Sequence, residues 1–173
     1  MSIRLRVVRR VNENVPASAG HSFNRRAQKE NAMRFMIMVK ATAQSEAGIM
    51  PADDTVFAAM ATYHEELAKA GVLLDASGLQ PTSKGWRVRY SAGKRSVIDG
   101  PFVETKELIA GYTLIQVRSR EEAMEWARRF PAPFGEDADG EIEVRQLYEL
   151  EDFEQSEAIQ RFRELETTRT TTR

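Results

Sequence analysis

Residues 97–117 read VIDGPFVETKELIAGYTLIQV, and this stretch decides the fold because two strand-like runs meet in it across a turn that contains a carboxylate. The turn is predicted at Asp99, Gly100 and Pro101, since glycine reaches positive φ freely and proline fixes φ and donates no backbone N–H. From Leu108 to Val117 the residues on both faces are mostly apolar. This run therefore predicts a central strand that is covered on both sides.

The composition predicts a single domain with tails. The chain has 173 residues, 42% of them hydrophobic, and a formal net charge of −1, which gives no general electrostatic reason for direct binding to nucleic acid or to an anionic membrane. Because there is no cysteine, disulfides, thiolate nucleophiles and zinc–thiolate sites are excluded. No apolar run reaches the length of a membrane span or a secretory signal. We expect a soluble, cytoplasmic protein.

Residues 1–32 form a basic, irregular segment in which arginine and lysine outnumber glutamate. A nucleic-acid arm and a transit-like peptide share this composition, but we interpret the segment as a disordered N-terminal extension. The composition changes at Met33, so the domain is predicted over residues 33–153. Residues 154–173 are predicted to form a C-terminal helix with a thin apolar stripe, followed by a disordered tail.

Within the domain, hydrophobic periodicity predicts a strand, a helix, two or three strands, a second helix and a last strand. The first helix is expected to begin at Asp53 and Asp54, whose carboxylates can cap it, and to end near Ala70. The second is expected to begin with a capping box of Ser119 and Glu122. The stripe of the first helix that is predicted to face inward consists of Phe57, Met60, Ala61, His64, Leu67 and Ala68.

This order of elements is that of a ferredoxin-like βαββαβ fold, an α+β architecture in which both helices cover one face of an antiparallel sheet. The strands are apolar on their other face as well, and a soluble monomer rarely exposes so large an apolar surface. We therefore predict a homodimer joined through that face. The C-terminal helix is the alternative cover.

Several stretches together point to one family: MRFM at 33–36, HEEL at 64–67, AGVL at 70–73, GLQP at 78–81, DGPFVETKE at 99–107 and EWA at 125–127. Through them, the segment from Met33 to about Phe153 resembles the YCII-related family in its DGPF-domain branch. The resemblance implies a dimeric α/β barrel in which two sheets pack face to face. It also implies a cleft beside the first helix and the Asp-Gly-Pro turn.

The resemblance implies no single reaction. Most members of the family have no known activity, and a few relatives are lyase-like enzymes acting on chlorinated aromatic rings, for which a His–Asp pair has been proposed as the active site. Other DGPF proteins are associated with extracytoplasmic-function sigma factors. These two groups lead to different expectations for this chain, one catalytic and one regulatory.

His64 and Asp99 are the candidate catalytic residues, because an imidazole that titrates near neutrality and a carboxylate that orients it can form an acid–base dyad. We expect an ionised Asp99 to raise the pKa of His64 unless burial outweighs the attraction. The alternative is a hydrogen-bonded core histidine and an aspartate that caps its own turn.

Phe102, Glu104 and Lys106 follow the turn and are the candidate ligand-binding residues, with Lys106 as an anion clamp; the alternative is a solvated loop. The stripe of Arg87, Arg89 and Arg95 suits either an anionic ligand or a solvated sheet face. We predict neither a cofactor nor a metal. With one histidine in the domain and no cysteine, only oxygen ligands such as Asp75, Asp99 and Glu104 are left for a metal, without the spacing of a calcium loop.

Two classes of function follow. The preferred one is a small-ligand-binding or regulatory protein, associated with an extracytoplasmic-function sigma factor. The alternative is a cofactor-free, lyase- or isomerase-like enzyme that acts on a small ring compound through His64 and Asp99.

Overall fold

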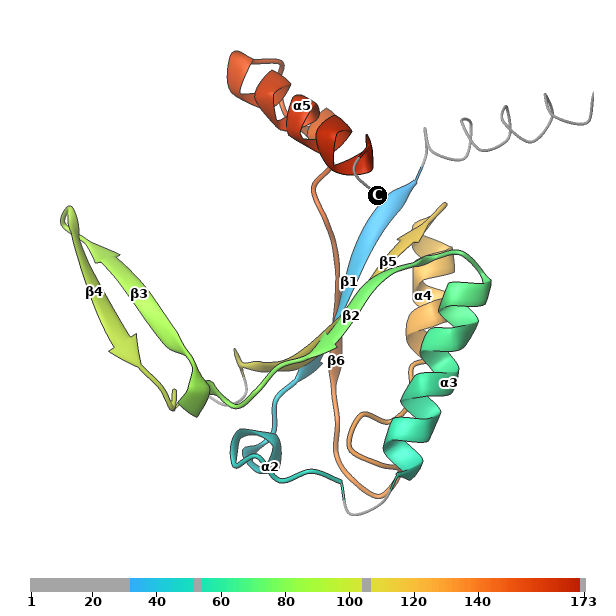
Figure 1. The fold of residues 1–173 in the computed structure, drawn as a ribbon. Helices are drawn as coiled ribbons and strands as arrows, with labels where there is room; N and C mark the ends of the chain where they lie inside the picture. The colour runs from blue at the N-terminus through green and yellow to red at the C-terminus, as the bar shows by residue number, and fades with distance from the viewer. Residues whose placement is uncertain (1–31, 52–53, 104–106, 172–173) are drawn as a thin grey trace, which may run out of the picture. The chain divides into compact units, whose positions relative to one another are not determined.

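The structure is a computed structural model that describes residues 32–51, 54–103 and 107–171. Its main sheet has four antiparallel strands in the order β2-β5-β1-β6 (Figure 1). The strands are β1 (Met33–Lys40), β2 (Leu73–Gly78), β5 (Ile109–Val117) and β6 (Ile142–Gln146). The run with two apolar faces is thus an inner strand, as predicted. Residues 1–31 of the predicted extension over residues 1–32, and the cap residue Asp53, lie outside the described residues.

Helices α3 (Thr55–Lys69) and α4 (Arg120–Arg128) lie against one face of this sheet (Figure 1). Their side chains and the sheet enclose a core that includes Phe35, Ile37, Tyr63, Leu67 and Ile115. The antiparallel α+β arrangement is consistent with the predicted ferredoxin-like fold. Among the described helices, none combines the length and the apolar character that crossing a membrane requires.

The inward face of α3 differs from the predicted stripe. Tyr63 is buried, whereas Ala61 and Ala68 are exposed. Tyr63 can enter the core because its hydroxyl donates a hydrogen bond to the backbone carbonyl of Trp126 at 2.9 Å. Burial raises the pKa of Tyr63 to about 12, so the hydroxyl keeps its proton.

The helix starts also differ in detail from the predictions. Asp54 is the N-cap of α3 but makes no capping hydrogen bond through its side chain. At α4, the Ser119 hydroxyl accepts from the backbone N–H of Glu122 at 3.2 Å, as predicted. The Glu122 carboxylate, however, accepts from the backbone N–H of Arg118 at 2.9 Å, not from that of Ser119.

Two of the strands predicted between the helices form a hairpin, a separate two-stranded sheet of β3 (Trp86–Ser91) and β4 (Lys94–Asp99). Its tight turn is made by Ala92 and Gly93, both with positive φ. A short 3-10 helix, η1 (Thr82–Lys84), precedes it, and a one-turn helix, α2 (Ala43–Glu46), follows β1. After β6 come η3 (Leu150–Asp152) and α5 (Glu157–Thr171), which continues into residues predicted to be a disordered tail.

Candidate functional site

The candidate site is a cavity that arises because side chains on the helix-facing side of the sheet become smaller toward the start of β5. Beside Ile115 the paired residues are Phe35 and Leu73, and these large side chains fill the core. Four residues earlier, Gly111 pairs with Gly78. Directly paired residues project from the same face of a sheet, so space opens where this face carries glycine.

Strands β2 and β5 also approach each other closely at Gly78 and Gly111. A Cβ atom on Gly111 would lie 3.0 Å from the carbonyl oxygen of Ser77 and 3.3 Å from Cα of Gly78. Glycine inside a strand commonly marks such an approach. Gly111 was therefore visible in the sequence as an unusual strand residue, although its role as part of a cavity floor was not predicted.

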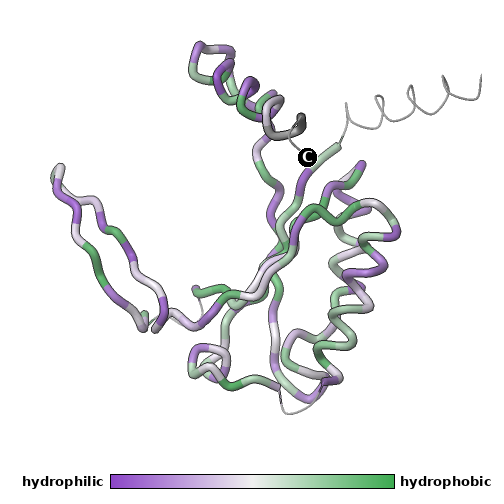
Figure 2. The backbone as a smooth tube through the Cα atoms, in the orientation of Figure 1, coloured by the Kyte–Doolittle hydropathy of each residue, from purple (hydrophilic) through white to green (hydrophobic). Residues whose placement is uncertain are grey.

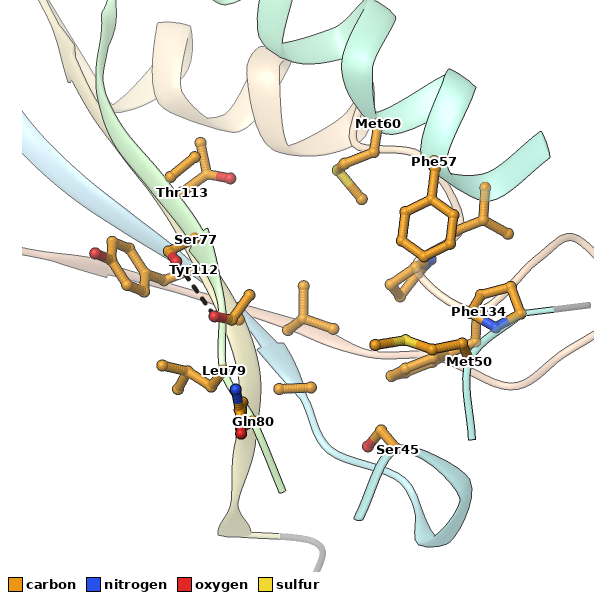
Figure 3. Close-up of a pocket in the computed structure, with 18 of the residues that line it drawn as sticks. Ser45, Met50, Phe57, Met60, Ser77, Leu79, Gln80, Tyr112, Thr113 and Phe134 are labelled. Carbon is orange, nitrogen blue, oxygen red and sulfur yellow. Dashed lines mark hydrogen bonds between the residues drawn. The ribbon is translucent and has the colours of Figure 1, made fainter. Parts of the chain in front are cut away.

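The cavity has a volume of about 720 Å³, within the range of roughly 300–1,000 Å³ that small-molecule sites occupy. Figure 3 shows Phe57, Met60 and Phe134 on one side of the space, and Leu79 and Gln80 on the other. Residues 48–51, in the connection between α2 and α3, complete the wall. None of the described lining residues is Asp, Glu, Lys or Arg.

His64 is the titratable imidazole of this wall. Its Nε2 atom lies 2.9 Å from Oγ1 of Thr113, and its ring also hydrogen-bonds to the backbone of Met60. Burial lowers the pKa of His64 below its ordinary value of 6.5, and the bond to Met60 opposes this shift only in part. The ring is therefore neutral at pH 7. Which atom donates in the contact between Nε2 and the Thr113 hydroxyl depends on the tautomer of the ring.

Asp99 lies elsewhere, at the end of β4, where it is exposed and pairs with Trp86 across the hairpin. Within the part of the chain that the structure describes, no hydrogen bond or ion pair joins Asp99 to His64, and Asp99 does not line the cavity. The two candidate catalytic residues are thus not brought together within one chain. Their catalytic role stays a prediction. The expectation was that Asp99 would raise the pKa of His64 unless burial outweighed the attraction. Burial is the larger effect, so the pKa of His64 is lowered.

The Asp-Gly-Pro turn holds the base of the hairpin. A Cβ atom on Gly100 would lie 1.8 Å from the carbonyl oxygen of Thr82, so only glycine fits. The Gly100 N–H donates to the carbonyl of Gly85 at 3.0 Å. The Thr82 hydroxyl donates to Glu46 Oε2 at 2.5 Å, which links η1 to α2 and hence to the loop along the cavity.

Phe102 has a position that the sequence did not predict. Its backbone N–H donates to the Thr82 hydroxyl at 3.1 Å, and its ring lies 3.9 Å from the guanidinium carbon of Arg87. Phe102 lines a second, smaller cavity of about 300 Å³, which shares residues 79–81 with the first. The other two candidate ligand-binding residues, Glu104 and Lys106, lie outside the described residues.

The sequence model of the YCII-related domain matches residues 33–151, which is more than half of the chain. The chain belongs to the YCII-related family. It is also similar to an uncharacterized protein of Rhizobium meliloti (strain 1021), with 38% identity over 76 residues. That match covers 44% of this chain and 61% of the other protein. The family predicted from the sequence motifs is confirmed.

The chemistry available to this YCII-related domain follows from its cavity. Aromatic, methionine and aliphatic side chains offer dispersion contacts to an apolar molecule, and among the described lining residues there is no Asp, Glu, Lys or Arg to pair with a charge. Within the described ranges, no group of three or more His, Asp or Glu side chains is placed to hold a metal ion. The cavity suits retention of a neutral molecule better than proton transfer.

Proposed function

We propose that this YCII-related domain binds a small, uncharged and largely apolar molecule in the cavity between α3 and the sheet, without catalysing a reaction. The observation that carries the proposal is the cavity of about 720 Å³ whose described walls contain no Asp, Glu, Lys or Arg. A charged ligand would lose its hydration there without gaining an ionic partner. An apolar ligand would gain by leaving water.

The state of His64 favours binding over catalysis. A general base needs a free ring nitrogen within reach of the substrate proton, and Nε2 of His64 is already in contact with Oγ1 of Thr113 at 2.9 Å. The lyase- or isomerase-like alternative requires His64 to release Thr113 and to find a carboxylate, because Asp99 is not in contact with it. The hydrogen-bonded histidine instead offers a fixed polar wall next to the apolar ligand.

The test uses a neutral fluorescent probe, 1-aminoanthracene, with variants that fill or enlarge the cavity. Ala76 pairs with Thr113 and lines the cavity, so Ala76→Leu should weaken probe binding by about tenfold or more. Met60→Ala enlarges the same space and should keep binding. Ser96→Leu adds the same side chain at an exposed position of β4 and is the matched control. Absence of probe binding, or equal binding by the Ala76 and Ser96 variants, would refute the proposal.

We further propose that the protein is a homodimer in the dimeric α/β barrel arrangement, that it belongs to the DGPF branch and that it works in the cytoplasm beside an extracytoplasmic-function sigma factor. The dimer is supported by the open face of the sheet, where Met36 pairs with Leu114 and Met38 with Tyr112. The branch and the sigma factor are supported by the DGPFVETKE stretch at 99–107. Co-purification of a tagged copy with a sigma factor tests the partnership.

A further inference from the structure

The hairpin β3–β4 has two faces of different character. Cross-strand pairs place Trp86 with Asp99, Val88 with Val97, and Tyr90 with Arg95 on one face. We call these six residues the apolar hairpin face. Figure 2 shows hydrophobic and hydrophilic positions along both strands of the hairpin, and on β4 the neighbouring apolar residues Val97 and Ile98 project from opposite faces.

The opposite face of the hairpin is basic. Its pairs are Arg87 with Ile98, Arg89 with Ser96, and Ser91 with Lys94. It therefore carries three cations, and two copies of this face would repel each other. The apolar hairpin face, in contrast, carries one cation, Arg95, and one anion, Asp99.

The apolar hairpin face is uncovered. Trp86 is 67% exposed, Tyr90 69% and Val97 66%, and in Figure 1 the hairpin lies apart from α3 and α4, the helices that cover the main sheet. An isolated two-stranded sheet is marginally stable in water. Large aromatic residues gathered on one exposed face are typical of an interaction surface.

We propose that the apolar hairpin face packs against the same face of a second copy of this chain, antiparallel, about a two-fold axis that passes near Val88 and Val97. The proposal goes beyond the binding function and beyond the contact between four-stranded sheets, because it gives the hairpin its own partner. A symmetric contact of this kind joins each residue to its counterpart twice.

Charge selects this arrangement. Arg95 and Tyr90 lie toward the tip of the hairpin, and Asp99 and Trp86 lie at its base. In an antiparallel pair, the tip of each copy faces the base of the other, so Arg95 meets Asp99 and Tyr90 meets Trp86 at both ends. A parallel pair would bring the two Arg95 side chains to one end and the two Asp99 side chains to the other, which is repulsive.

The contact between Arg95 and Asp99 is available only between copies. The two residues belong to the same strand, four positions apart, which corresponds to about 13 Å. Within its own chain, Arg95 lies over the ring of Tyr90, with its guanidinium carbon 5.2 Å from the ring centre. If the effect of a substitution at Arg95 depends on the residue at position 99, the two side chains must therefore meet between two chains.

The first experiment is cross-linking, which the absence of native cysteine makes specific. Val88→Cys places a thiol at the centre of the apolar hairpin face, and Ser96→Cys places one at the centre of the opposite face. With a short bis-maleimide at low micromolar protein, the Val88→Cys chain should give covalent dimers at least about tenfold faster than the Ser96→Cys chain. Equal rates, or no covalent dimer from Val88→Cys, would overturn the proposal.

The second experiment tests the register by charge reversal. Arg95→Glu and Asp99→Lys each produce like charges at both ends of the pair. In the Val88→Cys chain, either variant alone should therefore slow the formation of covalent dimers by at least about tenfold. A mixture of the two variants should recover cross-linking, because each chain then meets opposite charges on the other. Failure of the mixture to recover, with both variants folded by circular dichroism, would exclude the antiparallel pairing.

Discussion

Nε2 of His64 lies 2.9 Å from Oγ1 of Thr113, a contact that joins helix α3 to the central strand β5 across the wall of the cavity. Thr113 is 2% exposed, so water cannot readily reach its hydroxyl. Loss of the hydroxyl would leave a ring nitrogen without a partner beside a largely apolar space. The contact is therefore part of both the stability of the fold and the polarity of the site.

Thr113→Val should lower the free energy of unfolding by about 1–3 kcal/mol, the usual cost of a buried polar atom that loses its hydrogen bond. Valine has nearly the shape of threonine, so packing should change little. Thr113→Ser keeps the hydroxyl and is the control for the bond. Urea unfolding of the three proteins measures the difference. A Thr113→Val protein as stable as the wild type would mean that Nε2 finds another partner.

His64 should make the stability of the fold depend on pH. Its folded-state pKa is lowered by burial, so the unfolded chain takes up the proton first as the pH falls. The stabilising contribution of neutral His64 is complete above the unfolded pKa, near 6.5, and is lost as the pH falls through the folded pKa. Urea unfolding between pH 7.5 and about pH 5 should therefore show a decline that is smaller in His64→Gln.

A pH titration of His64 distinguishes the observed contact with Thr113 from the predicted acid–base dyad with Asp99. Following the His64 ring by NMR, we expect a pKa below that of the unfolded chain and no change in Asp99→Asn. His64→Gln assigns the resonance, because the chain has one other histidine, His21. A His64 pKa above the unfolded value that falls in Asp99→Asn would restore the acid–base pair as a candidate.

Much of the fold could be predicted from local patterns. The alternation from Leu108 to Val117, the Gly100-Pro101 turn and the hairpin are each encoded within a few neighbouring residues, and the structure has all three. The inward face of α3 was harder to predict, because alanine counts as apolar in a periodic pattern whether or not it is buried. Tyr63 is recognised as a core residue only once the carbonyl of Trp126 is in place for its hydroxyl.

The site could be predicted only in part, for a related reason. The sequence singles out His64, which lines the cavity, but its partner Thr113 is 49 positions away, and only the way α3 lies across the sheet brings the two together. Asp99 was paired with His64 because a carboxylate can orient an imidazole and because the family resemblance implied a cleft beside the first helix and the Asp-Gly-Pro turn. The hairpin instead carries Asp99 away from α3, and no periodicity in one sequence reveals where a hairpin points.

Gly100 should tolerate no side chain. In Gly100→Ala the new Cβ would overlap the carbonyl of Thr82, which lies 1.8 Å from its ideal position. We expect a loss of about 3 kcal/mol in the free energy of unfolding, with increased exposure of Phe102 to solvent. Gly85→Ala is the matched control, because its Cβ would meet the same Thr82 oxygen at an ordinary 3.7 Å. Equal stability of the two variants would show that the turn is not tightly packed.

The open face of the four-stranded sheet should join two copies of the chain. Met36 and Leu114 lie opposite each other at its centre. At one end of the face, Arg34 is held by Glu149, with Nη2 2.8 Å from Oε2, and Glu166 of α5 is close enough to raise the pKa of Arg34 further. Helix α5 is therefore the competing cover for this face.

Sedimentation at low micromolar concentration separates the two covers when every chain also carries Arg95→Glu, which weakens the proposed hairpin contact. Met36→Lys places a charge in the proposed interface and should weaken the dimer by about tenfold or more. Lys40→Met removes a charge at the end of the same strand and should leave the dimer intact. A chain that ends at Phe153 lacks α5 and should still be a dimer, because the apolar centre of the sheet does not depend on the helix. A full chain that is monomeric and dimerises only after this truncation would show that α5 covers the sheet and that the dimer prediction is wrong.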